Sequence, residues 1–242
     1  MRPNVLTLLL AVCLSLAPMA QATAEDRVLV FTHTAKFRHD SIPTTVSTLR
    51  LLAERERMAV DQSENPADFT PANLARYKVV VFANTTGDVL DATQQTAMEG
   101  FIRSGGGFVG VHSAADTEYD WPWYGQLVGA YFRNHPEGLQ FSRVQPEQEG
   151  KPAGVSWPVR DELYNYRSNP RGSVQIVATV DEKTYTGGTM GADHPIAWCH
   201  PFDGGRSWYT GLGHDKAVYR SREFQAHLRQ GLLYAAGREP DC

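Results

Sequence analysis

The stretch Ser104–Asp116, SGGGFVGVHSAAD, decides the fold that the sequence predicts. Its three glycines end a segment with helical patterning, Phe108–His112 has the apolar composition of a buried strand, and small residues follow. A strand that turns sharply into the next segment is typical of open α/β sheets, which bind ligands at the carboxyl ends of their strands. His112 lies at this turn and is either a buried structural histidine or part of a site. Two further histidines at strand ends, His39 and His214, favour a site.

Strand-like and helix-like segments alternate along the chain before this stretch. Apolar strands are predicted at Arg27–Thr32, Met58–Gln62 and Lys78–Ala83, with helical or turn patterning between them. This order predicts an α/β fold: a doubly wound, mostly parallel sheet with helices on both faces. Later in the chain, Ile196–Cys199 and Arg206–Gly211 are separated by a glycine-containing turn and predict a late β-hairpin.

Capping residues mark the predicted helix ends. Asp40 or Ser41 precedes one apolar helical pattern, and Asp91 precedes another. Such side chains accept hydrogen bonds from the free backbone N–H groups at the start of a helix. Gly237 follows the last helical pattern and is expected to end it.

The first residues have the pattern of an export signal. Arg2 gives a positive start, Val5–Leu16 is an apolar run, and Ala22-Thr23-Ala24 is a typical cleavage site. The apolar run is too short for a transmembrane helix. The sequence therefore predicts a signal peptide over residues 1–24, cleavage near Ala24, and a periplasmic or secreted protein with one domain over residues 25–240.

Composition excludes two classes of partner. The formal charge is −4 at pH 7 and no basic run is present, so neither nucleic acid nor an anionic membrane surface is an expected partner. No segment after the apolar run is long enough to span a membrane. Cys199 lies in an apolar strand and is expected to pack as a small core residue. The sequence leaves open whether Cys199 and Cys242 pair.

Polar and aromatic residues gather in loops after predicted strands. The loop of residues 33–43 carries Phe37 and His39 directly before a helix, a position that favours anionic or oxygen-rich ligands. The stretch of residues 116–136 is rich in Trp, Tyr and Phe. Aromatic rings of this kind line sugar-binding clefts and also pack in cores, and core packing is the favoured interpretation for this stretch.

Several longer motifs resemble the ThuA-like (trehalose utilisation) family. These are FRHDSIP at 37–43, GGGFVGVHSAADTEYDWPWYGQLVGAYF at 105–132, DELYN at 161–165, TYTGGTMGADHPIAW at 184–198 and GLGH at 211–214. Members of this family resemble class I glutamine amidotransferases. The resemblance implies a flavodoxin-like α/β fold and a role in carbohydrate catabolism.

Comparison with the amidotransferases shows what this chain lacks. Their strand-end turn carries a nucleophilic cysteine, and His112 stands at that position here. His214 resembles the catalytic histidine, but Lys216 replaces the glutamate that should follow. Ser113 lies one position away from the turn and does not support a hydroxyl nucleophile. Amidotransferase activity is therefore not expected, because the thiolate is absent.

What remains is a pocket of histidines, carboxylates and aromatic walls at the strand ends. The predicted catalytic residues are His112, His214, Glu162 and Asp116. The predicted substrate-binding residues are Phe37, His39, Tyr119, Tyr164 and Thr186. The candidate ligands for a divalent, zinc-like metal are His39, His112 and His214, which no short metal-binding motif connects.

Two functions fit this pocket. The first is an exported enzyme that acts on a sugar or keto-sugar by histidine and carboxylate acid–base chemistry, with or without a metal, as an isomerase, lyase or hydrolase. The second is a non-catalytic carbohydrate-binding protein on a degenerate amidotransferase-like fold. Titratable groups at the strand ends favour the enzyme. A small-molecule carbohydrate is the expected partner in both cases.

Overall fold

The computed structural model describes residues 25–242, so the predicted signal peptide lies outside the described residues. A ten-stranded mixed sheet has the order β2-β1-β3-β4-β12-β11-β10-β6-β7, with β8 paired to β6. Its parallel half consists of β2 (Met58–Ser63), β1 (Asp26–Phe31), β3 (Val79–Ala83), β4 (Gly107–Val111) and β12 (Gly205–Thr210). Its antiparallel half consists of β11 (Pro195–Phe202), β10 (Gln175–Val180), β6 (Gln140–Gln148), β7 (Lys151–Pro152) and β8 (Trp157–Asp161). A separate pair joins β5 (Phe132–Asn134) to β9 (Asn165–Tyr166).

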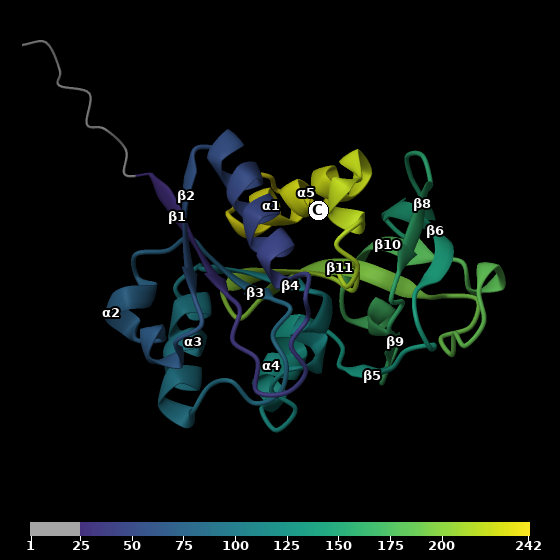
Figure 1. Ribbon diagram of the computed structural model, residues 1–242. Helices are drawn as coiled ribbons and strands as arrows, with labels where there is room; N and C mark the ends of the chain where they lie inside the picture. Colours follow the sequence, from purple (N-terminus) through teal and green to yellow (C-terminus); the bar gives the residue numbers. More distant parts are fainter. Residues whose placement is uncertain (1–24) are drawn as a thin grey trace, which may run out of the picture.

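Helices cover both faces of the parallel half (Figure 1). One face carries α1 (Ile42–Arg55) and α5 (Arg222–Ala235). The other face carries α2 (Pro71–Leu74), α3 (Ala92–Arg103) and α4 (Pro122–Val128). This arrangement confirms the predicted flavodoxin-like α/β fold.

Alternating side chains of the central strands fill two separate cores. Val28 and Val30 of β1 pack in the cluster that includes residues of α1 and α5. Leu29 and Phe31 pack in the other cluster, with residues of α3 and α4. Successive side chains of a strand point to opposite faces, so an entirely apolar strand requires cover on both sides. The run Val79–Ala83, which is buried throughout, meets this requirement.

Asp91 and Ser41 precede helices as predicted, but only Asp91 caps its helix through a side-chain hydrogen bond. Asp91 accepts hydrogen bonds from the backbone N–H groups of Thr93 and Gln94, and the Gln94 side chain completes a capping box. Ser41 precedes α1, but its hydroxyl donates to the carbonyl oxygen of Gly213 at 3.0 Å instead of capping the helix. The serine therefore supports a loop of the site, described below.

The antiparallel half is larger than the predicted hairpin. The hairpin of β11 and β12 is present, but residues 139–159, whose sequence pattern is irregular, contribute further antiparallel strands next to β10. Cys199 of β11 is buried and also forms a disulfide with Cys242. Cys199 therefore lies in the core, as the sequence predicts. It also pairs with Cys242, a question that the sequence leaves open.

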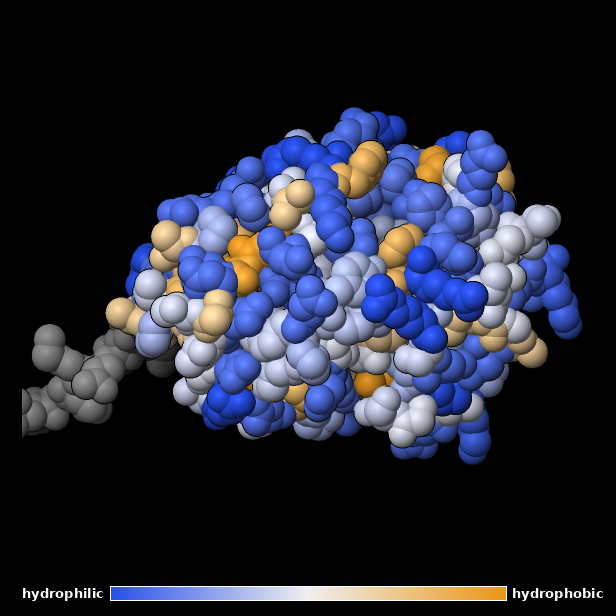
Figure 2. All heavy atoms as spheres, turned by 90° about the horizontal axis from the view of Figure 1, so that it is seen from below, coloured by the Kyte–Doolittle hydropathy of each residue, from blue (hydrophilic) through white to orange (hydrophobic). Residues whose placement is uncertain are grey.

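The surface is mainly hydrophilic on the face shown in Figure 2, where hydrophobic residues form separate small areas. Within residues 25–242, no helix is long and apolar enough to cross a membrane. Phe37 is one of the large apolar side chains that are exposed, at 63%. It lies at the site described next.

Candidate metal centre and active site

The carboxyl ends of four strands bring histidine and glutamate side chains together. The contributing residues are His39 after β1, His112 after β4, Glu162 after β8 and His214 after β12. One possible ligand atom of each residue lies within 4.8 Å of the others. The structure therefore brings together four of the residues that the sequence analysis placed in one pocket.

His112 occupies a backbone conformation that fixes the direction of its side chain. Its φ of 52° lies in the left-handed region, at the first residue after β4. Such a conformation costs about 1–3 kcal/mol at an ordinary residue and needs support from its surroundings. The ring is fully buried, and its centroid lies 4.2 Å from that of Tyr164. Two residues before His112, Gly110 packs against Tyr209, Ala114 and Phe108, which leave no room for a side chain at that position.

The two ring nitrogens of His112 have different environments. Nδ1 lies 2.8 Å from the carbonyl oxygen of Gly211, which only accepts, so Nδ1 carries the proton and Nε2 presents a lone pair. Nε2 lies 3.4 Å from Glu162 Oε2 but has no hydrogen-bond partner within residues 25–242. His214 Nδ1, 3.1 Å from the same oxygen, also has none. His112 is therefore buried, as expected of a structural histidine, and its Nε2 still faces the cluster.

Glu162 directs its two oxygens to different groups. Oε2 faces His112 and His214, whereas Oε1 lies 3.3 Å from Nε2 of His135. Burial raises the pKa of the Glu162 carboxyl, but the contacts with His112 and His214 outweigh burial and hold it well below its usual range. The cluster therefore contains one ionised carboxylate.

The histidines respond to the same surroundings in opposite ways. Burial, followed by the neighbouring His112 and His214, lowers the pKa of His39 to about 2, so this ring is neutral. Burial also lowers the pKa of His214, but the Glu162 carboxylate reverses the shift and raises it above its ordinary value. His39 Nδ1 lies 3.3 Å from the hydroxyl oxygen of Ser113, which leaves its Nε2 available to a ligand.

A buried network fixes the loop that carries His214. The Asp161 carboxylate accepts hydrogen bonds from the backbone N–H groups of Gly213 at 2.6 Å and Asp215 at 2.8 Å. The carbonyl oxygen of Gly213 accepts from Ser41 at 3.0 Å and from Asn84 at 3.1 Å. Both sides of the backbone next to His214 are therefore held. This is why Ser41 does not cap α1.

The cluster opens into a cavity of about 270 Å³. Its lining residues are Phe37, His39, Asp116, Phe132, His135, Glu162, Tyr164 and His214. Sequence reasoning missed Phe132 and His135, which lie in an aromatic stretch that reads equally well as packing. A larger cavity of about 380 Å³, lined by Trp157, His227 and Cys242 among others, contains none of the cluster residues.

Two residues predicted to bind substrate do not line this cavity. The hydroxyl of Tyr119 donates to Asp116 Oδ1 at 2.7 Å, so this side chain contacts a cavity residue and orients it. Thr186 is exposed in the connection between β10 and β11. The structure does not bring Thr186 to the cavity lining.

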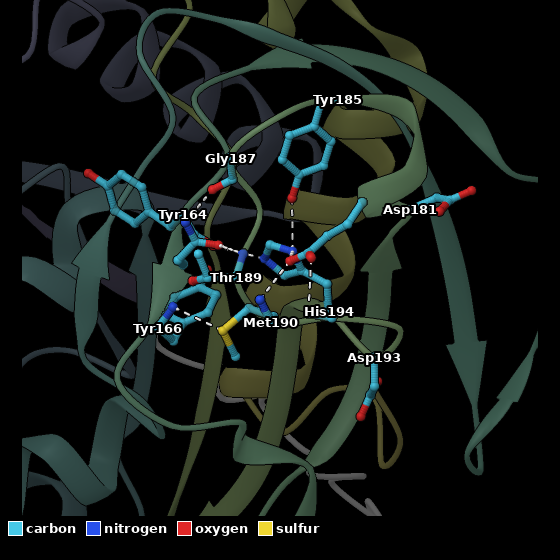
Figure 3. A network of polar contacts seen from close by, with 12 residues as sticks. Tyr164, Tyr166, Asp181, Tyr185, Gly187, Thr189, Met190, Asp193 and His194 are labelled. Carbon is cyan, nitrogen blue, oxygen red and sulfur yellow. Dashed lines mark hydrogen bonds and ion pairs between the residues drawn. The ribbon is translucent and has the colours of Figure 1, made fainter.

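That connection instead contacts the segment that carries the cavity residue Tyr164 (Figure 3). His194 Nε2 donates to the carbonyl oxygen of Tyr164 at 2.9 Å. The Asn165 side chain donates to the Gly187 carbonyl oxygen at 3.0 Å and accepts from the Thr189 N–H at 2.8 Å. These contacts hold the segment after β8, which carries the cavity wall residue Tyr164. The long motif at residues 184–198 therefore has a supporting role for the site.

The arrangement of the cluster fits a divalent cation. Buried polar atoms in proteins nearly always have hydrogen-bond partners, so converging nitrogens without them require an explanation. Imidazole nitrogen and carboxylate oxygen are ligands that zinc prefers, and a bond from the opposite ring nitrogen to a carbonyl, as in His112, is typical of metal-binding histidines. His39, His112, His214 and Glu162 are therefore the residues that could hold a metal ion.

Fold and site together define a class of protein: a flavodoxin-like α/β protein with a histidine and glutamate cluster at the strand ends. Within this class, the chain belongs to the ThuA family, described as trehalose utilisation, whose model matches residues 27–235.

Solved structures are similar in fold. A putative ThuA-like protein from Bacteroides uniformis has 19% sequence identity and a TM-score of 0.71, covering 90% of this chain and 95% of that chain. A putative ThuA-like protein from Parabacteroides merdae has 19% identity and a TM-score of 0.71, covering 88% and 90%. A β-galactosidase from Rahnella sp. R3 has 14% identity and a TM-score of 0.54, covering 86% of this chain but 31% of that chain. At these identities the similarity concerns the fold alone. No curated protein matches the sequence.

Proposed function

We propose that this protein is a metal-assisted enzyme that acts on a sugar or keto-sugar. The observation that carries the proposal is the convergence of four ligand atoms within 4.8 Å, two of them on buried nitrogens without hydrogen-bond partners among residues 25–242. The carbohydrate class is supported by the description of the family as trehalose utilisation. The exposed Phe37 ring at the cavity also supports it, because aromatic faces stack on sugars.

His39, His112, His214 and Glu162 would hold the metal ion. A divalent cation bound there would polarise a sugar carbonyl or lower the pKa of a water molecule. The protein contributes a rigid cradle: Gly211 fixes the proton of His112, and Asp161 holds the loop of His214. Because the four ligands follow different strands, a shift of any one of them relative to the others would disrupt the metal site.

Asp116 is the proposed proton carrier, since it lines the cavity and lies outside the ligand set. The Tyr119 hydroxyl donates to its Oδ1, which leaves Oδ2 to accept a proton from the substrate. Phe37, Tyr164 and Phe132 form walls that orient the sugar and exclude water. Isomerisation, elimination and hydrolysis of a keto-sugar can all use this combination of a positioned carboxylate and an electrophilic centre.

The competing function is a carbohydrate-binding protein without catalysis. The exposed Phe37 ring and the modest cavity of about 270 Å³ would serve binding alone. We also propose that the protein is exported, on the pattern of residues 1–24. Amino-terminal sequencing of material from the periplasm or medium tests export, with a start near Glu25 as the expected result.

A substrate panel tests the catalytic proposal. The zinc-loaded and the chelator-treated protein are incubated with glucosides, trehalose and their 3-keto derivatives, and products are followed by mass spectrometry. Turnover of at least one keto-sugar that is lost on chelation and in Asp116→Asn supports the enzyme. Binding without turnover across the panel, in both metal states, identifies a binding protein instead.

A further inference from the structure

We propose that the site accepts an anionic sugar, and that Lys36 and Arg167, which pack on the ring of Tyr119 next to the cavity residue Asp116, bind its charged group. The inference rests on the proposed carbohydrate function and adds the substrate class. Its starting point is Tyr119, which the sequence analysis assigned to substrate binding and which the cavity lining does not include.

Two cations from distant segments meet at the ring of Tyr119. The guanidinium carbon of Arg167, directly after β9, lies 4.1 Å from the ring centroid, and Lys36 Nζ lies 5.6 Å from it. The hydroxyl of the same ring donates to Asp116, which lines the cavity. Lys36 directly precedes Phe37, another lining residue. Both cations therefore pack on a side chain that contacts a cavity residue, and we call this position the rim of the cavity.

Neither cation forms a salt bridge in the part of the chain that the structure describes. Lys36 and Arg167 are both exposed. Arg38, two residues after Lys36 in the same loop, differs in this respect, because it pairs with Glu64 at 2.6 Å. In this loop, Arg38 is paired, whereas the positive charge of Lys36 stays available at the rim.

The aromatic contact prepares these cations for an anion. A cation that packs on a ring keeps its charge and its N–H donors but has lost side-chain freedom, so less entropy is lost when an anion binds. Arginine presents donors in a plane that matches a carboxylate or a phosphate. A sugar whose reacting carbon lies at the cluster would place a carboxylate or phosphate substituent at this rim.

Matched sugar pairs test the inference. Binding of glucose and glucuronate, galactose and galacturonate, their 3-keto methyl glycosides, and glucose 6-phosphate to the zinc-loaded protein is measured by calorimetry at 50 and 200 mM salt. We expect the anionic member of at least one pair to bind about tenfold more tightly than its neutral partner, with a smaller advantage at high salt. Lys36→Gln and Arg167→Gln should each weaken anion binding about fivefold and leave neutral binding within twofold. Arg38→Gln is the control and should change neither.

The outcomes separate this inference from the function on which it rests. Equal binding of anionic and neutral partners by the wild-type protein overturns the inference and leaves the carbohydrate function standing. Absence of binding by every sugar, neutral or charged, overturns both. An equal loss in Arg38→Gln shows a general effect of surface charge and overturns the assignment to Lys36 and Arg167.

Discussion

Replacing His112 by two different amides separates the roles of its two nitrogens. In His112→Asn, the amide nitrogen takes the place of Nδ1 and keeps a donor for the carbonyl oxygen of Gly211, while nothing replaces Nε2. In His112→Gln, the longer side chain places its amide near the position of Nε2 and leaves Gly211 without a donor. The first variant should therefore lose metal binding, and the second should lose stability.

The magnitudes follow from the contacts. Leaving the buried Gly211 carbonyl without a partner costs about 1–3 kcal/mol. For a protein of this size each kcal/mol lowers Tm by about 2–4 °C. Asparagine tolerates the φ of 52° at position 112 and loses mainly the ring contact with Tyr164, worth about 1 kcal/mol. Removal of a ligand should weaken metal binding by more than about 100-fold, because loss of a merely supporting residue costs about 10–100-fold.

Thermal unfolding of the metal-free proteins and calorimetric titration with zinc measure both quantities on the same preparations. We expect His112→Asn to melt close to the wild type and to bind zinc weakly, and His112→Gln to melt lower while retaining part of its zinc affinity. Zinc affinity of His112→Asn equal to that of the wild type would refute the assignment of Nε2 as a ligand.

Three further predictions concern the support of the site and the stability of the fold. Asp161→Asn should lower the free energy of unfolding by about 2 kcal/mol and zinc affinity about 10–100-fold. The reason is that Gly213 and Asp215 donate to different oxygens of Asp161, and an amide has only one oxygen. Denaturant unfolding measures the first effect, and calorimetry measures the second. Cys242→Ser should lower stability by up to about 4 kcal/mol, from the loop that the disulfide closes, with unchanged zinc affinity; an equal loss of Tm in the wild type on reduction is the check. Burial lowers the pKa of His39 to about 2 and of His227 to about 3, from 6.5. The contribution of these neutral rings to the free energy of unfolding is complete above pH 6.5. Below pH 6.5 it decreases by up to about 1.4 kcal/mol per pH unit for each ring. The midpoint of urea unfolding should therefore drop between pH 7 and pH 5, and it should drop less in His39→Gln.

The parallel half of the sheet could be predicted because its signals are local. Val79–Ala83 is apolar at every position and is covered on both faces, and Asp91 is followed by the helix that it caps. The antiparallel half could not be predicted in the same way. The strands in residues 139–159 are partly exposed and contain proline and charged residues, so their pairing with one another and with β10 decides their conformation.

The site was predictable where a residue follows a strand directly. His112, His214 and Glu162 all do so or lie within a short loop, and topology brings them to one edge. His135 follows the short strand β5, which pairs with β9, and its approach to Glu162 depends on that long-range pairing. Thr186 lies in a glycine-rich connection. Its position in the sequence does not show that this connection contacts the segment with Tyr164 and Asn165.

The central claim is that three histidines and a glutamate hold one metal ion. Crystals of the protein as purified, after dialysis against zinc, allow anomalous diffraction on both sides of the zinc absorption edge. We expect one strong anomalous peak per chain, among His39, His112, His214 and Glu162. A zinc-saturated crystal with no peak between these residues would contradict it.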